Sequence, residues 1–247
     1  SSALFESLDE PLAPAQRRKY LRLASQLDLQ PGDRVLEIGC GWGGFAEIAA
    51  GEFGCNVIAL TLSREQAAYA RDRVEQAGLS DHIEVRLQDY RDVQGKFDKI
   101  VSIEMFEAVG ERYWSVYLDT LRERLAPRGK AALQIITMDD AYFEDYRLNP
   151  EFIQRYIFPG GMLPGSSLFQ KAAAAASLAI SDRFTFGQSY GETLRRWDMA
   201  FQNAWPTIKT LGFDDRFYRM WRFYLCYCEV GFDTGRINVA HFTLNHA

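Results

Sequence analysis

The sequence predicts an α/β fold in which seven strands form a mostly parallel sheet, and three observations support this prediction. Short apolar segments alternate with amphipathic helical segments through residue 137, which is the order of a doubly wound sheet. The first apolar segment leads directly into a turn with four glycines, which is typical of ligand-binding α/β proteins. The chain has 247 residues, enough for a single domain spanning 1–247 with a substantial core.

The first half of the chain supplies five strands and their connecting helices. A helix is expected where apolar residues recur at helical spacing after Pro14, and a Pro-Gly-Asp turn follows it. Each strand is a short run of aliphatic residues between turn signals, while Ser63 caps a helix that Gly78 ends. The expected strands are 34–38, 56–60, 83–87, 97–103 and 130–137, and the expected helices are 14–27, 45–53, 63–76 and 113–125.

Residues 138–180 interrupt this alternation. They are rich in aromatic residues and end in an alanine-rich helix at 171–178. Because open α/β sheets bind ligands at the carboxyl ends of their strands, we expect 138–180 to be a helical insertion between the fifth and sixth strands that covers the substrate. The remaining expected elements are strands at 180–186 and 238–244 and helices at 190–204 and 213–230. The aromatic stripes of these last two helices are expected to belong mainly to the core.

Composition excludes several classes of protein. A net charge of −5 argues against non-specific nucleic-acid binding. No apolar run approaches the ~20 residues of a membrane span. The cysteines at 40, 55, 226 and 228 lack the spacing of a zinc site or a disulfide framework, so we expect a cytoplasmic protein without a metal. Because the chain begins with Ser1 and not with Met, we expect residues or a domain upstream of it.

The glycine turn predicts a site for a ligand that carries a positive charge. Its spacing, Gly39-x-Gly41-x-Gly43, differs from the G-x-G-x-x-G of dinucleotide folds, and no Lys-Ser/Thr of a phosphate loop follows. Glu37 stands two residues before the first glycine, where its carboxylate can meet an amine at the end of the strand. Glu37 and the glycines resemble motif I of the class I methyltransferases that use S-adenosylmethionine (SAM).

The ends of the next strands supply further candidates for a cofactor site. The second strand ends without the acid that NAD-binding folds place there, which disfavours NAD. Thr61 and Gln66 can contact a ribose or the methionine end through hydroxyl and amide groups, although helix capping is an alternative role for Thr61. Asp89 and Tyr90 can hold an adenine by hydrogen bonding and stacking. The predicted cofactor-binding residues are Glu37, Gly39, Gly41, Gly43, Thr61, Leu62, Gln66, Asp89, Tyr90 and Ile103.

Five segments, in the same order along the chain, resemble one enzyme family. They are Glu37 to Gly44, Thr61 to Ser63, Gln88 to Asp92, Met105 to Gly110 and Tyr156 to Gly161. Together they resemble the cyclopropane-fatty-acyl-phospholipid synthases and the related mycolic acid cyclopropane synthases over nearly the whole chain. The resemblance implies a Rossmann-like class I methyltransferase fold with SAM as cofactor. It also implies that the SAM methyl group is added to a cis double bond in a phospholipid acyl chain, and that a bound bicarbonate removes a proton to close a cyclopropane ring.

The resemblance further implies which residues hold the bicarbonate. Glu107 matches the family's Glu, Ile136 the Ile that contributes a backbone group, and Tyr190 its Tyr. Two positions depart from the family, because Ser2 stands in the place of a Cys and Gln134 in the place of a His. Gln134 can donate a hydrogen bond but cannot titrate, so an anion can still bind. The predicted catalytic residues are Glu107, Tyr190, Gln134, Ile136 and Ser2.

These departures leave alternatives open. The proton can leave from elsewhere, which gives a methylene- or methyl-branched chain, or the pocket can methylate a small molecule. A non-catalytic subunit that binds SAM and lipid is a third alternative, although the glycine turn, Glu107 and Tyr190 together argue against it. Glu104 is a candidate second acid in the site, or else a carboxylate that faces outward or pairs with a cation.

A phospholipid substrate also implies partners. We expect an unsaturated phospholipid acyl chain, transient contact at the inner membrane surface and no nucleic acid, while a homo-oligomer stays open. Basic residues of the insertion and of the later helices can attract anionic headgroups, at about 1 kcal/mol each near the surface, or else they are scattered solvated charges. They are Arg147, Arg155, Lys171, Arg183, Arg195 and Arg196.

Overall fold

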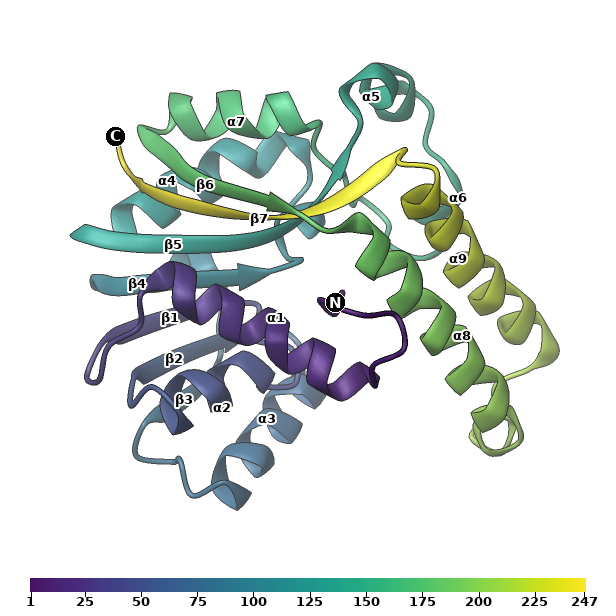
Figure 1. The fold of residues 1–247 in the computed structure, drawn as a ribbon, viewed down its shortest axis with the longest axis horizontal. Coiled ribbons are helices and arrows are strands. Elements are labelled where there is room, and N and C mark those ends of the chain that lie inside the picture. The colour runs from purple at the N-terminus through teal and green to yellow at the C-terminus, as the bar shows by residue number, and fades with distance from the viewer.

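The computed structural model describes all of residues 1–247 and confirms the predicted sheet. Its seven strands have the order β3-β2-β1-β4-β5-β7-β6, and only β7 runs antiparallel to its neighbours (Figure 1). The strands are β1 (Arg34–Ile38), β2 (Asn56–Thr61), β3 (Ile83–Leu87), β4 (Phe97–Ile103), β5 (Leu125–Met138), β6 (Leu178–Thr185) and β7 (Ile237–His246). Since β2 and β4 flank β1 on opposite sides, the strand order reverses at β1, and ligands of such sheets bind at the carboxyl end of that point.

Two layers of helices cover the sheet. The helices are α1 (Leu12–Leu27), α2 (Gly44–Gly51), α3 (Arg64–Gln76), α4 (Trp114–Arg124), α5 (Asp140–Leu148), α6 (Phe152–Tyr156), α7 (Ser166–Ala175), α8 (Gly187–Thr210) and α9 (Asp215–Asp233). The core under α1, α2 and α3 includes Val35, whereas the core under α4 and α7 includes Leu36 and Ile38. Because side chains alternate along a strand, Glu37 points toward the layer of α1 and α2.

The segment between β5 and β6 forms three helices, two of which the sequence did not predict. α7 begins at Ser166 rather than at residue 171, and it packs against the sheet with Phe169 and Ala173 in the core. The shorter α5 and α6 begin at the capping residues Asp139 and Glu151 and lie beyond the carboxyl ends of the parallel strands (Figure 1). Residues 139–165 are therefore the part of this segment that stands outside the sheet layers.

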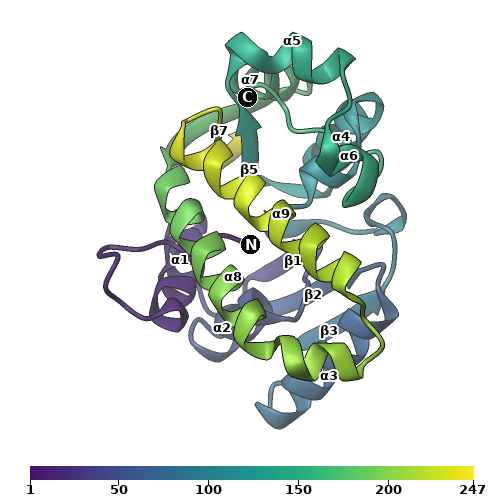
Figure 2. The same cartoon turned by 90° about the vertical axis from the view of Figure 1, so that its right-hand side faces the viewer.

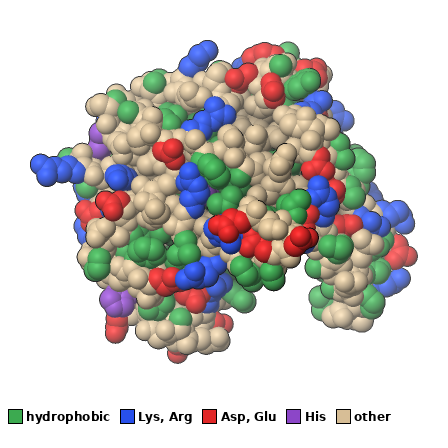
Figure 3. All heavy atoms as spheres, in the orientation of Figure 1, with side chains coloured by type: hydrophobic (Ala, Val, Ile, Leu, Met, Phe, Trp, Pro, Cys, Tyr) green, Lys and Arg blue, Asp and Glu red, His purple; other side chains and the backbone are tan.

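α8 and α9 form a long hairpin that projects from the same end of the sheet (Figures 1 and 2). α8 continues through Pro206, past its predicted end at 204. No hairpin residue between Leu194 and Leu225 is buried, and in the space-filling view the tip stands apart from the body (Figure 3). The prediction that its aromatic stripes belong mainly to the core is confirmed only near the sheet, where Trp197, Trp221 and Tyr224 pack against a small core that includes Leu194 and Leu225. Farther out, rings such as Phe201 and Trp205 pack between the two helices alone. None of the helices is both long and apolar enough to cross a bilayer.

Candidate active site

The glycine turn joins β1 to α2 at the point where the strand order reverses. Gly39, Gly41 and Gly43 have φ angles of +81°, +52° and +82°, in the region that favours glycine. A Cβ atom on Gly39 would stand 3.0 Å from the side chain of Met105, which is closer than real Cβ atoms normally approach. The turn therefore requires glycine, and its backbone lies at the positive end of α2, where a ligand can approach.

Glu37, one residue before the end of β1, is a buried acid with one unpaired oxygen. Its Oε2 atom is buried and has no hydrogen-bond partner. Burial raises the pKa of Glu37 to about 8, while a hydrogen bond from the Ala46 backbone and the charge of Lys19 act in the opposite direction. A buried acceptor without a donor is costly, so this position suits a ligand that brings an N–H group or a positive charge. The amino group of the predicted cofactor meets that requirement.

Thr61 and Gln66 lie together at the end of β2. The Thr61 hydroxyl donates to the side-chain oxygen of Gln66 at 2.7 Å, and it also accepts the backbone N–H of Ser63. The Thr61 hydroxyl is thus engaged within the protein, whereas Ser63 caps α3 as predicted. Leu62 beside it is exposed, and Ile103 at the end of β4 is half-buried against the core under α1 and α2.

Asp89 and Tyr90 follow β3, but their side chains contact other residues of the protein in ways that the sequence does not predict. Asp89 accepts two hydrogen bonds from the Arg91 guanidinium, at 2.9 and 2.7 Å, which holds the pKa of Asp89 below its usual value. The Tyr90 ring is buried in the core and meets Tyr117 edge to face, with ring centroids 5.3 Å apart. The stacking role expected for Tyr90 therefore competes with its place in the core.

Three of the predicted anion-binding residues converge on the carboxylate of Glu104. The backbone N–H of Ser2 and the side-chain amide of Gln134 donate to Oε1 at 2.9 and 2.7 Å. The Tyr190 hydroxyl donates to Oε2 at 2.7 Å. Glu104 follows β4 with a φ of +53°, a left-handed conformation that is rare for residues other than glycine. The sequence offered Glu104 only as a candidate second acid, and the structure places it where the bicarbonate was predicted.

Glu107 is the second acid of the site. Its Oε1 atom accepts the backbone N–H of Ile136 at 2.5 Å, whereas its buried Oε2 atom has no partner. Burial and then the nearby charge of Glu104 raise the pKa of Glu107 to about 8. Glu107 and Ile136, which were each predicted to hold the bicarbonate, are therefore hydrogen-bonded to each other. Near neutral pH Glu107 carries a proton.

The raised pKa of Glu107 predicts a pH-dependent stability. Between pH 6 and 8 an unfolded chain has lost this proton while the folded chain retains much of it, so the free energy of unfolding falls as pH rises. In Glu107→Gln no proton can be lost, and we expect the fall over this range to be smaller by about 2 kcal/mol. Urea unfolding at pH 6 and pH 8 measures this difference. An equal fall in both proteins would contradict the protonation of Glu107.

His241 extends the network, and the sequence analysis did not identify it. It lies on β7 directly opposite Gln134 in the strand register, and its Nε2 atom is 2.9 Å from the Gln134 side-chain oxygen. Because the Gln134 amide nitrogen donates to Glu104, its oxygen is the acceptor and His241 is the donor. Burial lowers the pKa of His241 well below its ordinary value, so the ring is neutral. The only signal in the sequence is a histidine between two apolar residues, Ala240 and Phe242, of the final strand.

Replacement of His241 tests this orientation of the Gln134 amide. In His241→Phe the buried Gln134 oxygen loses its donor, and we expect the free energy of unfolding to fall by about 1–3 kcal/mol. The substitution should cost clearly less in a Gln134→Leu background, where no acceptor is left unpaired. Urea unfolding of the unmodified chain, the two single variants and the double variant completes a double-mutant cycle. Additive effects would show that His241 does not act through Gln134.

A cavity of about 730 Å³ opens from these acids toward α6 and α9. Nineteen of its 28 lining residues are hydrophobic, and Glu104, Glu107 and Tyr190 are among its few polar groups. A mostly apolar cavity with a small polar cluster suits an extended apolar ligand that reacts at one place. Its lining also includes aromatic residues of the hairpin, namely Trp197, Phe223, Tyr224 and Tyr227.

The sequence of the chain is similar to those of two known enzymes. The chain is 43% identical to the tuberculostearic acid methyltransferase UfaA1 of Mycobacterium tuberculosis, over 94% of this chain and 55% of that protein. It is 38% identical to the cyclopropane-fatty-acyl-phospholipid synthase of Escherichia coli, over 94% of this chain and 58% of that protein. The chain thus spans little more than half the length of these two relatives.

Solved structures agree with the sequence relatives. The mycolic acid cyclopropane synthase CmaA1, crystallised with S-adenosylhomocysteine (SAH) and CTAB, superposes with a TM-score of 0.92. The two chains are 29% identical, and the match covers 99% of this chain and 88% of that one. The fold is therefore that of the class I methyltransferases, and SAH is the product that SAM leaves after methyl transfer. Residues 1–242 match the family described as mycolic acid cyclopropane synthetase. This chain belongs to that family of SAM-dependent methyltransferases.

Proposed function

We propose that this chain adds the methyl group of SAM to a cis double bond in an unsaturated phospholipid acyl chain, and that Glu104 takes up the proton that is then lost. One observation carries the proposal. The donors that were expected to hold bicarbonate, from Ser2, Gln134 and Tyr190, hold the Glu104 carboxylate. Names of relatives support the substrate class, since both the E. coli and the M. tuberculosis enzymes act on fatty acyl groups.

The residues at the end of β1 fit SAM. The unpaired oxygen of Glu37 suits the amino group, the glycine turn admits the methionine end, and Thr61 with Gln66 offers polar groups at the end of β2. When bound, SAM supplies an electrophilic methyl group. We infer from these contacts that the cofactor lies across the carboxyl ends of β1 and β2.

The side chains around Glu104 suit a reaction with a positively charged intermediate. Methyl addition breaks the π bond of the alkene, forms a C–C bond and leaves a positive charge on the neighbouring carbon. The Tyr190 ring stacks on Phe232 with centroids 4.3 Å apart, and Tyr224 also lines the cavity. Aromatic faces stabilise a nearby cation, and an apolar lining excludes water that would react with it.

One carboxylate oxygen of Glu104 has an acceptor site left for a proton. A carboxylate oxygen offers about two acceptor sites. Oε1 already accepts from Ser2 and Gln134, whereas Oε2 accepts only from Tyr190. When Oε2 takes a proton from the alkylated chain, the C–H electron pair returns to carbon and forms either a new double bond or the third side of a ring.

We propose a methylene-branched acyl chain as the product. In this case the hydrogen on the methylated carbon moves as hydride to the neighbouring cation, and the methyl group then loses its proton to Glu104. The 43% identity to a tuberculostearic acid methyltransferase favours this product, because tuberculostearic acid carries a methyl branch. A cyclopropane is the second candidate, favoured by the 38% identity to the E. coli synthase.

Vesicles of a cis-monounsaturated phospholipid, incubated with the protein and SAM, test the proposal. The fatty acids are identified by gas chromatography and mass spectrometry, before and after hydrogenation, with and without bicarbonate. We expect a product heavier by one CH₂ that takes up hydrogen and forms equally well without bicarbonate. A product that resists hydrogenation would establish the cyclopropane, whereas a need for bicarbonate would exclude Glu104 as the base. No product despite SAM binding would overturn the proposal.

A further inference from the structure

We propose that the mouth of the cavity is a surface that docks on an anionic phospholipid bilayer. This docking rim consists of exposed residues of α6, the turn after it and one face of α9, namely Arg155, Tyr156, Phe158, Arg216, Arg219, Phe223, Tyr227 and Val230. The proposal rests on the proposed function, since it concerns how a membrane lipid reaches Glu104. It adds the face of the molecule through which that lipid enters.

Exposure along the cavity lining locates its mouth. Glu104 and Tyr190 are largely buried at one end. Among the large hydrophobic residues of the lining, those with more than half of their surface exposed come from α9 or from the turn after α6, and they are Phe158, Phe223 and Val230. The cavity therefore opens between α6 and α9, which face the viewer in Figure 2.

An aromatic cluster joins the two sides of this mouth. Phe152 of α6 meets Phe223 of α9 edge to face, with centroids 4.7 Å apart, and lies 5.4 Å from Tyr156 and 6.4 Å from Tyr227. Tyr156 and Phe223 expose 61% and 53% of their surface to solvent. Clustered aromatic rings at a protein surface are typical of contact with the lipid headgroup region, where their amphipathic rings are most stable.

The charges of the docking rim are complementary to an anionic surface. Arg155, Arg216 and Arg219 are exposed, and none of them forms an ion pair or side-chain hydrogen bond. The acid nearest to the cluster, Glu151, is already paired with Arg236 at 3.0 Å and accepts from the Tyr227 hydroxyl. The free charge of the docking rim is therefore positive.

The spacing along α9 explains why cations and aromatic rings share one face. Arg216, Arg219, Phe223, Tyr227 and Val230 recur at intervals of three or four residues, so they lie along one side of the helix. Such a stripe, with apolar residues next to arginine, suits insertion of the rings while the guanidinium groups stay at the phosphates. A bilayer also holds the acyl chain that the cavity accepts.

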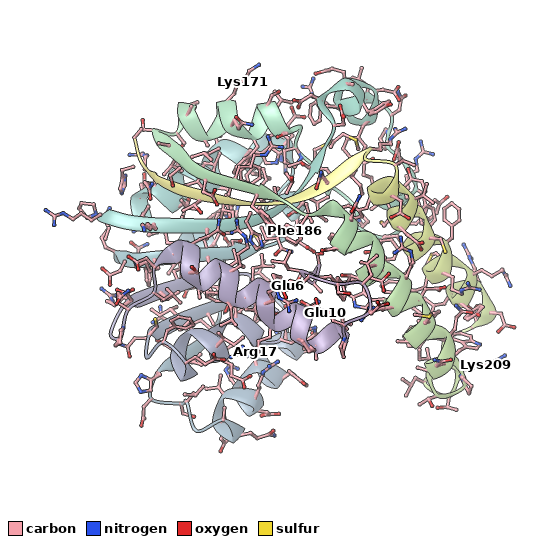
Figure 4. The ribbon with its side chains drawn as sticks, viewed as in Figure 1. Glu6, Glu10, Arg17, Lys171, Phe186 and Lys209 are labelled. Atoms are coloured by element: carbon pink, nitrogen blue, oxygen red, sulfur yellow. The ribbon has the colours of Figure 1, made fainter.

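Sedimentation with phospholipid vesicles tests the docking rim. The unmodified chain, Arg155→Glu/Arg219→Glu and Tyr156→Ser are mixed with vesicles of unsaturated phosphatidylcholine, with or without phosphatidylglycerol. Lys171→Glu on α7, which Figure 4 places away from α6 and α9, and Val116→Ser on α4 are the matched controls. None of the substituted residues lines the cavity, so activity on the same lipid in non-ionic detergent should be unchanged.

We expect phosphatidylglycerol to increase binding of the unmodified chain and both controls. The double arginine variant should bind at least about 25-fold more weakly to these vesicles, since each arginine near an anionic surface is worth roughly fivefold. Tyr156→Ser should weaken binding to both kinds of vesicle. Equal binding of the double variant and the unmodified chain would overturn the docking rim. So would an unmodified chain that binds no vesicle but alkylates an acyl chain carried by a protein.

The two proposals fail in different ways. If the unmodified chain binds vesicles through the docking rim but alkylates no lipid in vesicles or detergent, the docking rim is supported and the proposed function is wrong. If all variants alkylate vesicle lipid at the same rate and bind vesicles equally, the proposed function stands and the docking rim is wrong.

Discussion

Glu104→Gln is expected to reduce product formation by about 10²- to 10⁴-fold, the usual contribution of a positioned general base. The variant keeps the size of the side chain but cannot take up a proton. SAM binding should be unchanged, because Glu104 lies at the end of β4 and hydrogen-bonds only to the residues that surround it in the network. Single-turnover formation of the alkylated lipid and calorimetric SAM binding measure the two effects. Full activity in Glu104→Gln would exclude this residue as the base.

Glu104→Gly provides a sharper version of this experiment. Glycine is compatible with the left-handed backbone at this position, so the substitution should be tolerated there. Removal of the side chain frees the donors of Ser2, Gln134 and Tyr190, which can then bind a small anion. We expect this variant to be inactive without bicarbonate and to regain activity when bicarbonate is added. The absence of any rescue would show that the three donors do not form an anion site.

Glu37→Gln is expected to weaken SAM binding by about 10- to 100-fold, because a hydrogen bond to a charged group typically contributes about 1.5–3 kcal/mol. The substitution removes the negative charge while the buried volume stays the same. Glu52→Gln is the matched control, since Glu52 lies at the end of the neighbouring helix α2 and pairs with Arg17 outside the site. Equal affinity of Glu37→Gln and the unmodified chain would remove Glu37 from the cofactor site.

The pH dependence of SAM binding provides a second test of Glu37. Its pKa of about 8 means that the free protein must lose a proton before the carboxylate can pair with the SAM amino group. Affinity should therefore increase from pH 6 to pH 8 in the unmodified chain. In Glu37→Gln this increase should be absent, which calorimetric titrations at the two pH values can establish.

Much of the fold could be predicted because its signals are local. Each strand of the parallel sheet is a run of aliphatic residues with turn residues at both ends, and the predicted and observed bounds of β1, β3 and β4 are identical. α6 gave no such signal, since five residues cannot show helical periodicity. It begins instead with a reciprocal pair of hydrogen bonds between Glu151 and Gln154.

The site was predicted less completely because its decisive contacts are not local. Motifs grouped Ser2, Gln134 and Tyr190 around one anion, but nothing in the sequence shows that a left-handed backbone at Glu104 turns a carboxylate into that place. His241 is separated from Gln134 by 107 positions. Only the pairing of β5 with β7 brings the two side chains together.

The position of β7 has a consequence for how the chain acquires its activity. β5 and β6 do not pair with each other, and β7 is the strand that joins them. During synthesis the edge of β5 therefore stays open until the last strand leaves the ribosome, and an open edge invites pairing with other chains. His241 arrives with that strand, so the support of Gln134 and the closure of the sheet occur in the same event. A nascent chain therefore lacks the support of Gln134 during the whole period in which the edge of β5 is open to pairing with other chains.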